Sequence, residues 1–319
     1  MNTITTLIPA YKTQYLVELL TSLRVQTRPS PRIIISDDSP NGAFREVLYS
    51  KAMENLRAGL NIEFHEGPRS GSYENFKQLL TLWDRSSELV HVMLDDDVMY
   101  PDFYERHLTG HASGDYSCSI SRRWSANEAG QPCAGQPIPP AVARHNDRMI
   151  ELGPDVMFLT TVGDCKNWFG EFSNAIFRAD CTDILFDLKV GDVSFAGLWD
   201  LGAFVAASLR RPVCYIQDYL GYFRISAHQN SSKMNSPLMK GAILGFAALA
   251  IGARRIGRLS TEQAQKAHAM LAPAVAMRYA GEADMLPFLA AMPALAAGEA
   301  DGEARFLAAW ARFQADNGF

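Results

Sequence analysis

Three consecutive aspartates, Asp95, Asp96 and Asp97, directly follow the apolar run of residues 89–94. An apolar strand that ends in acids places several negative charges at the carboxyl edge of a sheet, where open α/β sheets bind ligands. Carboxylates this close raise one another's pKa unless a cation lies among them. Mg2+ and Mn2+ prefer oxygen ligands and usually retain a substrate phosphate. The pattern therefore favours a metal–diphosphate site; the alternative is a solvated acidic turn in which Asp96 or Asp97 caps the next helix.

The elements that position these acids alternate between strand and helix. Short apolar or β-branched runs predict four strands, at residues 5–8, 32–36, 61–65 and 89–94. Apolar side chains at helical spacing predict three helices between them, at residues 13–26, 43–57 and 72–83. We expect Pro9 to end the first strand and Ser72 to cap the third helix. This order predicts a mostly parallel sheet with helices on both faces.

Composition narrows the class of protein. The chain has 319 residues, of which 48% are hydrophobic and 20% are charged, as in an ordinary globular protein. A net charge of −5 argues against a general nucleic-acid-binding protein, which normally has a basic surplus. Five scattered cysteines without a C-x-x-C pair indicate reduced thiols in a cytoplasmic protein. The N-terminus has neither the charged start nor the long apolar core of a signal peptide.

The C-terminal part of the chain has a different composition. From about residue 237 it is rich in Ala, Leu and Met at helical spacing. Three prolines are expected to divide it into several short helices: Pro273, Pro287 and Pro293. We therefore predict two regions, residues 1–235 and a helical appendage of residues 236–319.

The N-terminal pieces, in their order, resemble the family 2 glycosyltransferases, which have the glycosyltransferase A fold. The matching segments are Leu7-Ile8-Pro9-Ala10-Tyr11, residues 16–27, Ile33-Ile34-Ile35-Ser36-Asp37-Asp38-Ser39, Leu94-Asp95-Asp96-Asp97 with Pro101, Trp199-Asp200-Leu201, and residues 222–228. The resemblance covers residues 1 to about 232, and its motifs are specific as an ordered set.

This resemblance implies a Rossmann-like, mixed but mostly parallel α/β sheet flanked by helices. It also implies a metal-dependent, inverting transfer of a sugar from a nucleotide-diphospho-sugar, with a UDP- or dTDP-sugar favoured, to a hydroxyl group. The implied cofactor is Mn2+ or Mg2+, and the implied acceptor is a glycan or lipid-linked molecule in bacterial surface polysaccharide synthesis. The implied location is the cytoplasm, including the inner face of the membrane.

The resemblance assigns the donor site to the ends of the first two strands. Pro9, Ala10 and Tyr11 would line the nucleotide pocket. Asp38, or its neighbour Asp37, would accept a hydrogen bond from an N–H of uracil or thymine, because an ionised carboxylate can only accept. Taken by themselves, Asp37 and Asp38 are explained equally well by a turn or a helix cap.

In the acidic motif, the resemblance makes Asp97 and Asp95 metal ligands, and Asp95 and Asp96 reach the ribose. The register of this motif is open by one residue. The cation would neutralise the departing nucleoside diphosphate as a Lewis acid. Arg69 would contact the diphosphate or the base, beside a helix whose first N–H groups face phosphate. The alternative for Arg69 is an ordinary surface arginine.

An inverting transferase needs a base that deprotonates the acceptor hydroxyl group. By resemblance this base is Asp200, whose apolar neighbours would raise its pKa toward a useful value. Asp192 is the alternate candidate, and a structural alternative for Asp200 is to cap the helix that follows it.

Two further groups come from the closing motif and from an aromatic run. Arg224 would contact phosphate, and His228 would join the metal, for which a neutral imidazole is an acceptable ligand. A lone histidine is more often structural. Trp168 and residues 169–174 either line the acceptor pocket or pack in the core.

The apolar stretch of residues 241–253 is too short to span a bilayer comfortably. Followed by Arg254 and Arg255, it lies on a membrane surface in one interpretation, as a peripheral contact beside a lipid-linked acceptor. In the other, it packs on the catalytic region or on a second copy of the chain in a homodimer. We favour packing, because interior helices have the same composition.

Other functions fit the sequence less well. A dinucleotide-binding dehydrogenase would have G-x-G-x-x-G after the first strand, where Pro9-Ala10-Tyr11-Lys12 stands instead. A nucleotidyltransferase would have a glycine-rich basic loop there. A non-catalytic nucleotide- or glycan-binding protein on the same fold remains the alternative from another class. The presence of Asp95, Asp97 and Asp200 argues against it.

Overall fold

The computed structural model describes residues 3–226 and 233–319. Contacts divide these residues into two compact units. The first unit consists of residues 3–151, 169–186 and 210–226, and the second of residues 152–168, 187–209 and 233–319. Two internal segments therefore group with the C-terminal helices, and the boundary that we place after residue 235 stays a prediction.

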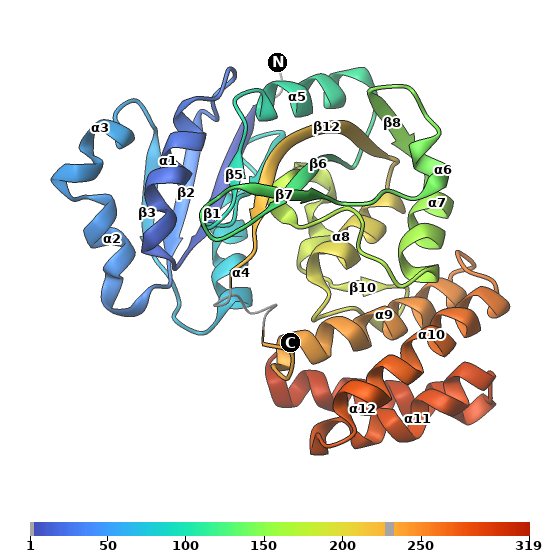
Figure 1. Cartoon of the computed structure of the whole chain (residues 1–319). Helices are drawn as coiled ribbons and strands as arrows, with labels where there is room; N and C mark the ends of the chain where they lie inside the picture. The colour runs from blue at the N-terminus through green and yellow to red at the C-terminus, as the bar shows by residue number, and fades with distance from the viewer. Residues whose placement is uncertain (1–2, 227–232) are drawn as a thin grey trace. The chain divides into compact units, whose positions relative to one another are not determined.

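The first unit is built on one mixed sheet of ten strands. The main order of the strands is β3-β2-β1-β4-β9-β6-β12-β5; in addition, β7 pairs with β6 and β8 pairs with β12. Figure 1 shows β3, β2 and β1 among the helices of this unit. The strands are β1 Ile4–Ala10, β2 Arg32–Asp37, β3 Ile62–Glu66, β4 Leu89–Val92, β5 Val98–Met99, β6 Cys118–Ala126, β7 Pro132–Gly135, β8 Met149–Leu152, β9 Ala175–Arg178 and β12 Val213–Arg224. The run β3-β2-β1-β4 is parallel, as are β6 and β12. This confirms the predicted fold class.

Helices cover both faces of the parallel part. The helices of the first unit are α1 Leu16–Arg24, α2 Ala43–Leu48, α3 Glu54–Arg57, α4 Ser72–Trp83, α5 Phe103–Ser113 and α6 Pro140–Ala143. Alternate residues of β2, Ile33 and Ile35, share one buried cluster with side chains of α1, α2 and α5. Helix α4 contacts β1 and β2 but contributes nothing to this cluster, so it packs on the opposite face.

Strand β1 runs through Pro9 to Ala10, which corrects the expectation that Pro9 ends it. Pro9 is still in register with Ser36 of β2, whereas pairing with β4 has ended at Leu7 and Val92. Proline is tolerated here because only one side of β1 is still paired, and an absent N–H then interrupts no second ladder. The strand consequently delivers residues 10–12 to the edge of the sheet.

Two helix predictions also need correction. The helix expected at residues 43–57 is broken into α2 and α3 by the 3-10 turn Lys51–Met53. Helix α4 has the predicted bounds, but Gly71, not Ser72, is its N-cap. Gly71 has φ +104°, a conformation that side chains rarely adopt, so Ser72 becomes the first helical residue.

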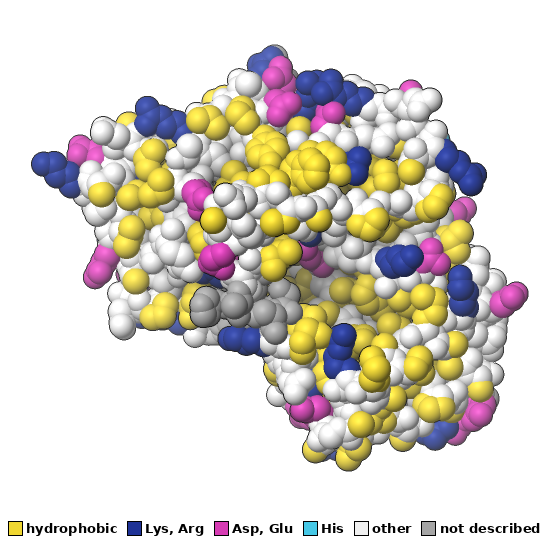
Figure 2. Space-filling view, viewed as in Figure 1, with side chains coloured by type: hydrophobic (Ala, Val, Ile, Leu, Met, Phe, Trp, Pro, Cys, Tyr) yellow, Lys and Arg dark blue, Asp and Glu magenta, His cyan; other side chains and the backbone are white. Residues whose placement is uncertain are grey.

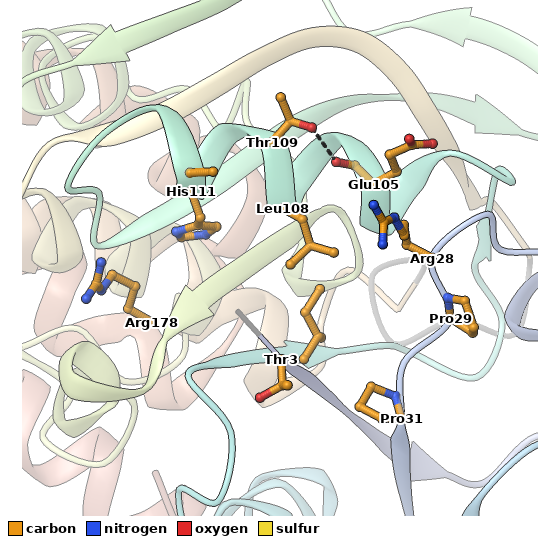
Figure 3. Close-up of a pocket in the computed structure, with 11 residues that line it drawn as sticks. Thr3, Arg28, Pro29, Pro31, Glu105, Leu108, Thr109, His111 and Arg178 are labelled. Atoms are coloured by element: carbon orange, nitrogen blue, oxygen red, sulfur yellow. Dashed lines mark hydrogen bonds between the residues drawn. The ribbon is translucent and has the colours of Figure 1, made fainter. Parts of the chain in front are cut away.

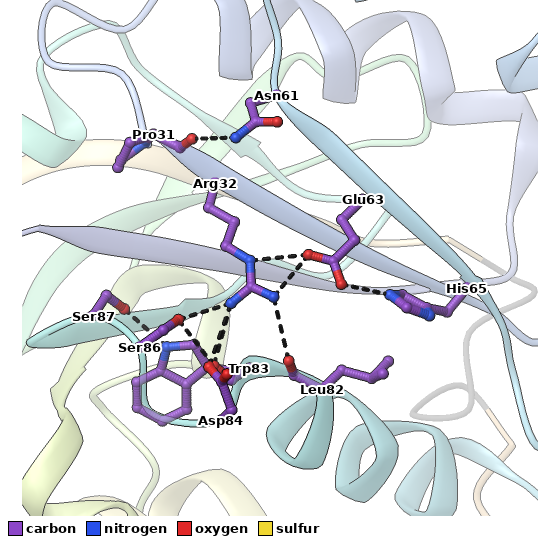
Figure 4. Close-up of polar contacts among 10 residues, drawn as sticks. All are labelled: Pro31, Arg32, Asn61, Glu63, His65, Leu82, Trp83, Asp84, Ser86 and Ser87. Carbon is purple, nitrogen blue, oxygen red and sulfur yellow. Dashed lines mark hydrogen bonds and ion pairs between the residues drawn. The ribbon is translucent and has the colours of Figure 1, made fainter.

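A polar cluster around Arg32 joins the C-terminal end of α4 to the sheet (Figure 4). Arg32 of β2 donates to Glu63 of β3 through Nε and Nη2, at 3.0 and 2.7 Å. Its Nη1 donates to Ser86 Oγ at 2.7 Å and to the carbonyl of Trp83 at 3.3 Å. The last carbonyls of a helix lack partners within it, and a cation satisfies them. Arg32 therefore holds the C-terminus of α4, and Gln78 in the middle of α4 donates to the carbonyl of Glu66 at the end of β3, at 2.7 Å.

The second unit is mainly helical and has its own core. Its elements are α7 Pro154–Phe158, a π-helical turn Leu159–Gly163, the hairpin β10 Lys189–Val190 and β11 Val193–Ser194, α8 Trp199–Ser208, α9 Pro237–Arg255, α10 Thr261–Tyr279, α11 Leu286–Ala297 and α12 Ala300–Asn317. Pro273 and Pro293 lie inside α10 and α11, so they do not divide the region as predicted, whereas Pro287 stands in the first turn of α11. The second core joins α9–α12 around Phe288, Phe306 and Trp310.

Helix α9 is longer than the apolar stretch that the sequence shows. It has 19 residues and a mean hydropathy of 1.3, so by length and composition it is the one described helix that qualifies as a membrane span. However, 61% of its apolar window is buried within the protein, and it packs on α10 and α12. Core helices of this kind have the same composition as membrane helices. Helix α9 also contacts β10 and β11, which lie within residues 1–235, in agreement with the packing interpretation that we favour.

The surface carries both signs of charge. On the face shown in Figure 2, lysine and arginine side chains are interspersed with aspartate and glutamate, and apolar side chains lie between them. A mixed surface of this kind agrees with the modest net charge of −5.

Candidate active site

The acidic motif lies at the end of β4 and is buried. Asp95, Asp96 and Asp97 are 4%, 4% and 2% exposed, so they are not a solvated turn. They do not cap the next helix either, because β5 follows them and α5 begins only at Phe103. Burying three adjacent carboxylates is unfavourable unless specific partners compensate for the lost water. The partners of each acid therefore indicate its role.

Asp95 anchors the loop that follows β1. Its Oδ2 accepts hydrogen bonds from the backbone N–H groups of Tyr11 and Lys12, both at 2.6 Å. Burial, followed by the charge of Asp96, raises the pKa of Asp95 to about 6, while Lys12 opposes the shift. Two N–H donors on one oxygen fix this carboxylate. Its predicted role as a metal ligand stays a prediction, and its observed contacts are those of a loop anchor.

Asp96 forms an ion pair with the ammonium group of Lys12. Burial by itself would lower the pKa of Lys12, but the charges of Asp96 and Asp95 outweigh it and raise that pKa. Lys12 thus supplies positive charge to the acidic motif from the end of β1. Sequence reasoning missed this role, although the position of Lys12 directly after Pro9-Ala10-Tyr11 was a usable signal.

Asp97 has the environment that best fits a cation. Its Oδ1 accepts from the backbone N–H of Arg224 at 3.2 Å, whereas its buried Oδ2 has no hydrogen-bond partner among the described residues. Burial and the charge of Asp96 raise its pKa well above the usual range. The hydroxyl group of Ser173 opposes this shift, as does the charge of Arg123, whereas the charge of Glu171 adds to it. A buried carboxylate oxygen without a donor is the atom that a divalent cation would satisfy.

The described residues contain no group of three or more His, Cys, Asp or Glu side chains placed to hold a metal ion. His228 lies outside the described residues. Mg2+ is commonly held by only one or two carboxylates together with substrate phosphates, so Asp97 and its acidic neighbours fit such an ion.

Arg224 is almost fully buried and holds the acidic turn in place. Its Nε donates to the backbone carbonyl of Asp96 at 3.1 Å, and its Nη1 to that of Glu128 at 2.6 Å. Its Nη2 donates to Glu18 at 2.7 Å, and the guanidinium lies 4.3 Å from the ring centroid of Tyr15. The predicted contact of Arg224 with phosphate stays a prediction, while the structure shows a positioning role.

The two acids after β2 differ in their surroundings. Asp37 is buried and accepts backbone hydrogen bonds from Ser39 at 2.9 Å and from Arg45 at 3.2 Å, one on each oxygen. It therefore forms the turn. Asp38 is half-buried, and its Oδ1 accepts from the backbone N–H of Arg69. Asp38 is thus the better placed of the two to accept a hydrogen bond from a base.

The loop after β3 closes over Asp38. A Cβ at Gly67 would lie 2.7 Å from Oδ1 of Asp38 and 2.8 Å from the carbonyl oxygen of Asp37, so only glycine fits there. The side chain of Arg69 is exposed, and its backbone has φ +55°. At the end of β1, Tyr11 is 56% exposed, whereas Ala10 is buried. The backbone N–H of Asp38 donates to the carbonyl of Ala10 at 2.9 Å, so the exposed residues Tyr11 and Arg69 both belong to segments that contact Asp38.

Arg123 and Glu171 form a second charged pair, and both charges act on Asp97 of the acidic motif. This pair was not predicted from the sequence. Arg123 of β6 is buried and donates through Nη2 to Glu171 at 2.7 Å. Its Nε and Nη1 have no hydrogen-bond partner within the described part of the chain, and its guanidinium lies 4.5 Å from the ring centroid of Phe223. Glu171 lies in the run of residues 169–174, which the sequence left open between the acceptor pocket and the core, and Arg123 belongs to no motif. Neither residue was therefore predicted to act on the acidic motif.

The aromatic run itself is mostly core. Trp168 is buried and donates to Thr160 Oγ1 at 3.1 Å. Phe169 is also buried, and Phe172 stacks on Phe76 at a centroid distance of 5.3 Å. These contacts agree with the packing alternative.

The candidate bases lie in the second unit. Asp200 stands in the first turn of α8, one residue inside it rather than at its cap, and its Oδ1 accepts from the N–H of Leu201 at 2.7 Å. Asp192 is exposed and forms an ion pair with Arg255, whose hydrogen bond lowers the pKa of Asp192. A lowered pKa makes a carboxylate a weaker base, which favours Asp200.

A separate pocket of about 690 Å3 lies at the amino end of β1 (Figure 3), away from the acidic motif at the carboxyl end. In Figure 3, Leu108 and His111 of α5 lie between Arg178 on one side and Arg28 on the other. Its lining includes none of the predicted nucleotide-sugar residues. We therefore place the candidate active site at the acidic edge, on its chemistry, and not in this pocket.

Comparison with known proteins identifies the family to which the chain belongs. The Glycosyl transferase family 2 model matches residues 5–168, about half of the chain, including β1, β2 and the acidic motif. No curated protein sequence gave a significant match.

Several solved structures share the fold. The structure of S. aureus TarS 1-349 in complex with UDP-GlcNAc is 13% identical, with a TM-score of 0.55 over 97% of this chain and 92% of that chain. The mannosyltransferase PcManGT from Pyrobaculum calidifontis, in complex with GDP-Man and Mn2+, is 14% identical, with a TM-score of 0.54 over 99% and 88%. A longer S. aureus TarS structure is 15% identical, with a TM-score of 0.52, and this chain covers 54% of its length. The family match and this shared architecture confirm what the motifs predicted: the chain belongs to glycosyl transferase family 2 and is a glycosyltransferase of the glycosyltransferase A fold.

Proposed function

We propose that the chain is a metal-dependent, inverting glycosyltransferase. It moves a sugar from a nucleotide-diphospho-sugar to a hydroxyl group of a glycan or lipid-linked acceptor. The observation that carries this proposal is the buried Oδ2 of Asp97, which has no hydrogen-bond partner among the described residues and lies in an acidic motif at the carboxyl edge of the sheet.

The ends of β1, β2 and β3 supply the donor site. Asp38 accepts a hydrogen bond from an N–H of the base, which favours uracil or thymine. The exposed ring of Tyr11 offers a face on which the nucleotide packs. Arg69 is exposed in the loop before α4, where it can reach the diphosphate. The neighbours TarS and PcManGT, solved with UDP-GlcNAc and GDP-Man, support a nucleotide-sugar donor.

The acidic motif would hold Mn2+ or Mg2+. Asp97 is the principal ligand, and Asp95 and His228 are the further ligands that we propose. The bound cation would supply positive charge that stabilises the leaving nucleoside diphosphate. The Mn2+ of the PcManGT complex supports a divalent cation for this fold. Lys12 and Arg224 keep the motif in shape through Asp96.

Asp200 is the proposed general base. Its carboxylate accepts the proton of the acceptor hydroxyl group as the oxygen attacks the anomeric carbon. The attack comes from the face opposite the diphosphate, so the bond from the sugar to the diphosphate breaks and the configuration inverts. Asp200 is half-buried in the first turn of α8, where most of the following residues are apolar (Leu201, Phe204, Val205), which suits a carboxylate that must take up a proton.

We place the reaction in bacterial surface polysaccharide synthesis, in the cytoplasm or at the inner face of the membrane. This setting rests on the resemblance of the motifs. It makes a lipid-linked or growing glycan the acceptor class.

A thermal-shift screen with UDP, dTDP, GDP and their sugars, with and without Mn2+, tests the donor site. A ligand that binds only the folded state raises its stability, by about 2.7 kcal/mol at 100 times its Kd. We expect UDP- or dTDP-sugars to stabilise the protein only with the cation, and the best donor to be hydrolysed or transferred. Binding that ignores the cation, without turnover of any donor, would instead identify a non-catalytic binding protein.

A further inference from the structure

The segment that leads into α8 is held by the C-terminal helices. Strand β11 ends at Ser194, five residues before α8 begins. The backbone carbonyl of Ser194 accepts a hydrogen bond from Trp310 Nε1 at 2.8 Å, and its hydroxyl accepts one from Gln314 Nε2 at 2.8 Å. Both donors lie on α12, so α12 fixes the chain on the approach to Asp200.

Helix α9 approaches the same segment so closely that only glycines fit. A Cβ at Gly245 would lie 2.8 Å from the Cβ of Leu198, which is the N-cap of α8. A Cβ at Gly197, where φ is +98°, would lie 3.0 Å from the backbone of Gly241. A Cβ at Gly252 would lie 2.6 Å from the carbonyl oxygen of Val190. Real Cβ atoms are essentially never found closer than 3.0 Å to another heavy atom.

Ion pairs fix the hairpin at its turn. Arg255, at the end of α9, pairs with Asp192 between β10 and β11. The same guanidinium donates to Glu303 of α12 at 2.9 Å through Nε. Glu303 also pairs with Arg254 at 2.5 Å. The hairpin, α9 and α12 are therefore also joined at the C-terminal end of α9.

We propose that α9 and α12 position the candidate base: they fix residues 190–198 and thereby the place of Asp200 at the start of α8. This inference rests on the proposed function, in which Asp200 takes the proton of the acceptor. It gives the helical region of residues 236–319 a role in catalysis without contact with either substrate. Gly245 and Trp310 are then positioning residues.

The physical reason is the steep dependence of proton transfer and attack on geometry. A displacement of about 1 Å in a catalytic group lowers a rate by about 100-fold. The contact between Gly245 and Leu198 sets the first turn of α8 directly, because Leu198 is its N-cap and Asp200 follows two residues later. An added methyl group at position 245 must push the helices apart or shift this turn.

Gly245→Ala is the sharpest test. Alanine is the better helix former, so the intrinsic stability of α9 rises while the contact with Leu198 is lost. We expect kcat to fall by 10-fold or more, with the KM for the donor unchanged and the Mn2+-dependent thermal shift with UDP unchanged. The clash with Leu198 also costs some stability, so kcat is compared well below the melting temperature of the variant, where a variant that merely weakened the fold would keep the kcat of the wild type.

Gly281→Ala is the matched control, because no atom lies within 4 Å of its added Cβ; it should keep the kcat of the wild type. Trp310→Phe is the second variant. It removes the hydrogen bond to Ser194 together with part of a buried side chain, and kcat measured on the folded variant should also fall at constant KM. It keeps the test decisive where Gly245→Ala fails to fold.

The outcomes separate the inference from the proposed function. Loss of activity in Asp200→Asn together with wild-type kcat in Trp310→Phe and in any folded Gly245→Ala would overturn the positioning role alone. Wild-type activity in Asp200→Asn, or no transfer from any donor by the wild type, would overturn the proposed function, and the inference would fall with it. A selective fall of kcat in both variants supports it.

Discussion

The Nε–H of Arg224 donates to the backbone carbonyl of Asp96 at 3.1 Å, although 128 residues separate the two in the sequence. The last residue of β12 thereby supports the turn that follows β4. The same guanidinium reaches Glu18 on α1 and the carbonyl of Glu128. Three segments of the first unit thus meet at one buried side chain beneath the acidic motif.

We expect Arg224→Lys to destabilise the first unit. An ammonium group cannot make the three directed contacts of the planar guanidinium. Hydrogen bonds that involve charged groups contribute roughly 1.5–3 kcal/mol each, and the partial exposure of Glu18 reduces that contribution. A loss of about 1–3 kcal/mol in the free energy of unfolding by urea is the expected result. Arg148→Lys, at an exposed arginine, should change little.

The same variant distinguishes positioning from phosphate binding. If Arg224 contacted the donor, Arg224→Lys would weaken binding of UDP and leave the stability of the free protein unchanged. That result would contradict the buried positioning role seen here.

Asp97→Asn should abolish the effect of the cation and leave the fold intact. The amide keeps the shape of the side chain but removes the charge that a divalent ion needs, and metal-based stabilisation of a transition state amounts to several kcal/mol. We expect kcat to fall by about 100-fold to 1,000-fold and the Mn2+-dependent thermal shift to vanish. Without the cation, the melting temperature should stay equal or rise, because a buried charge that resists ionisation has been removed.

Asp147→Asn is the control for this experiment, since Asp147 is exposed on a loop. An Asp97→Asn enzyme that kept its metal response would remove the acidic motif from the mechanism.

Substitution of Asp37 should mainly lower the stability of the protein, whereas substitution of Asp38 should mainly weaken binding of the donor. Asp37→Ala leaves the buried N–H of Ser39 without its acceptor, at about 1–3 kcal/mol for such a group, and also removes the part-buried hydrogen bond from the N–H of Arg45. Asp38→Ala removes one contact of the loop at Arg69 and should affect stability less. Titration of UDP should show the opposite order: Asp38→Ala loses affinity by 10-fold or more, and folded Asp37→Ala keeps most of it. A reversed order in either measurement would reassign the base-binding acid.

Because three histidines are buried, we expect the folded protein to lose stability in mild acid. Burial lowers the pKa of His91 and of His111 to about 4 and that of His107 well below its usual value. Each ring stays neutral in the folded state and takes up a proton on unfolding near its ordinary pKa of about 6.5. Their contribution is therefore complete above pH 6.5 and is lost as the pH falls toward 4, by up to about 1.4 kcal/mol per pH unit for each ring.

Unfolding by urea at pH 7.5 and 5.5 measures this dependence. Asp95, whose pKa is raised, acts in the opposite sense, so the comparison must be between wild type and variant. His91→Gln should reduce the difference between the two pH values, and the matched His145→Gln, at an exposed position, should not. Equal slopes in all three proteins would show that His91 does not titrate on unfolding.

Local patterns in the sequence predicted much of the first unit. Strand β2 and helix α4 appear where β-branched and helical spacing placed them, because their apolar faces follow periods of 2 and 3.6 residues. The break between α2 and α3 and the passage of β1 through Pro9 were not predicted. They depend on which sides of each element are paired or packed, and this is a property of the assembled sheet.

The candidate site, too, was predicted from the sequence in part only. The acidic motif and Asp38 were visible because carboxylates after apolar strands are a local signal. The sequence by itself determined the family, the order of the elements and the acids at the edge of the sheet. Only the tertiary structure decided what each acid does: Asp95 anchors a loop, Asp97 keeps a free oxygen among the described residues, and Arg123 reaches the motif. Burial and long-range hydrogen bonds decide these roles, and they exist only once distant segments have packed together.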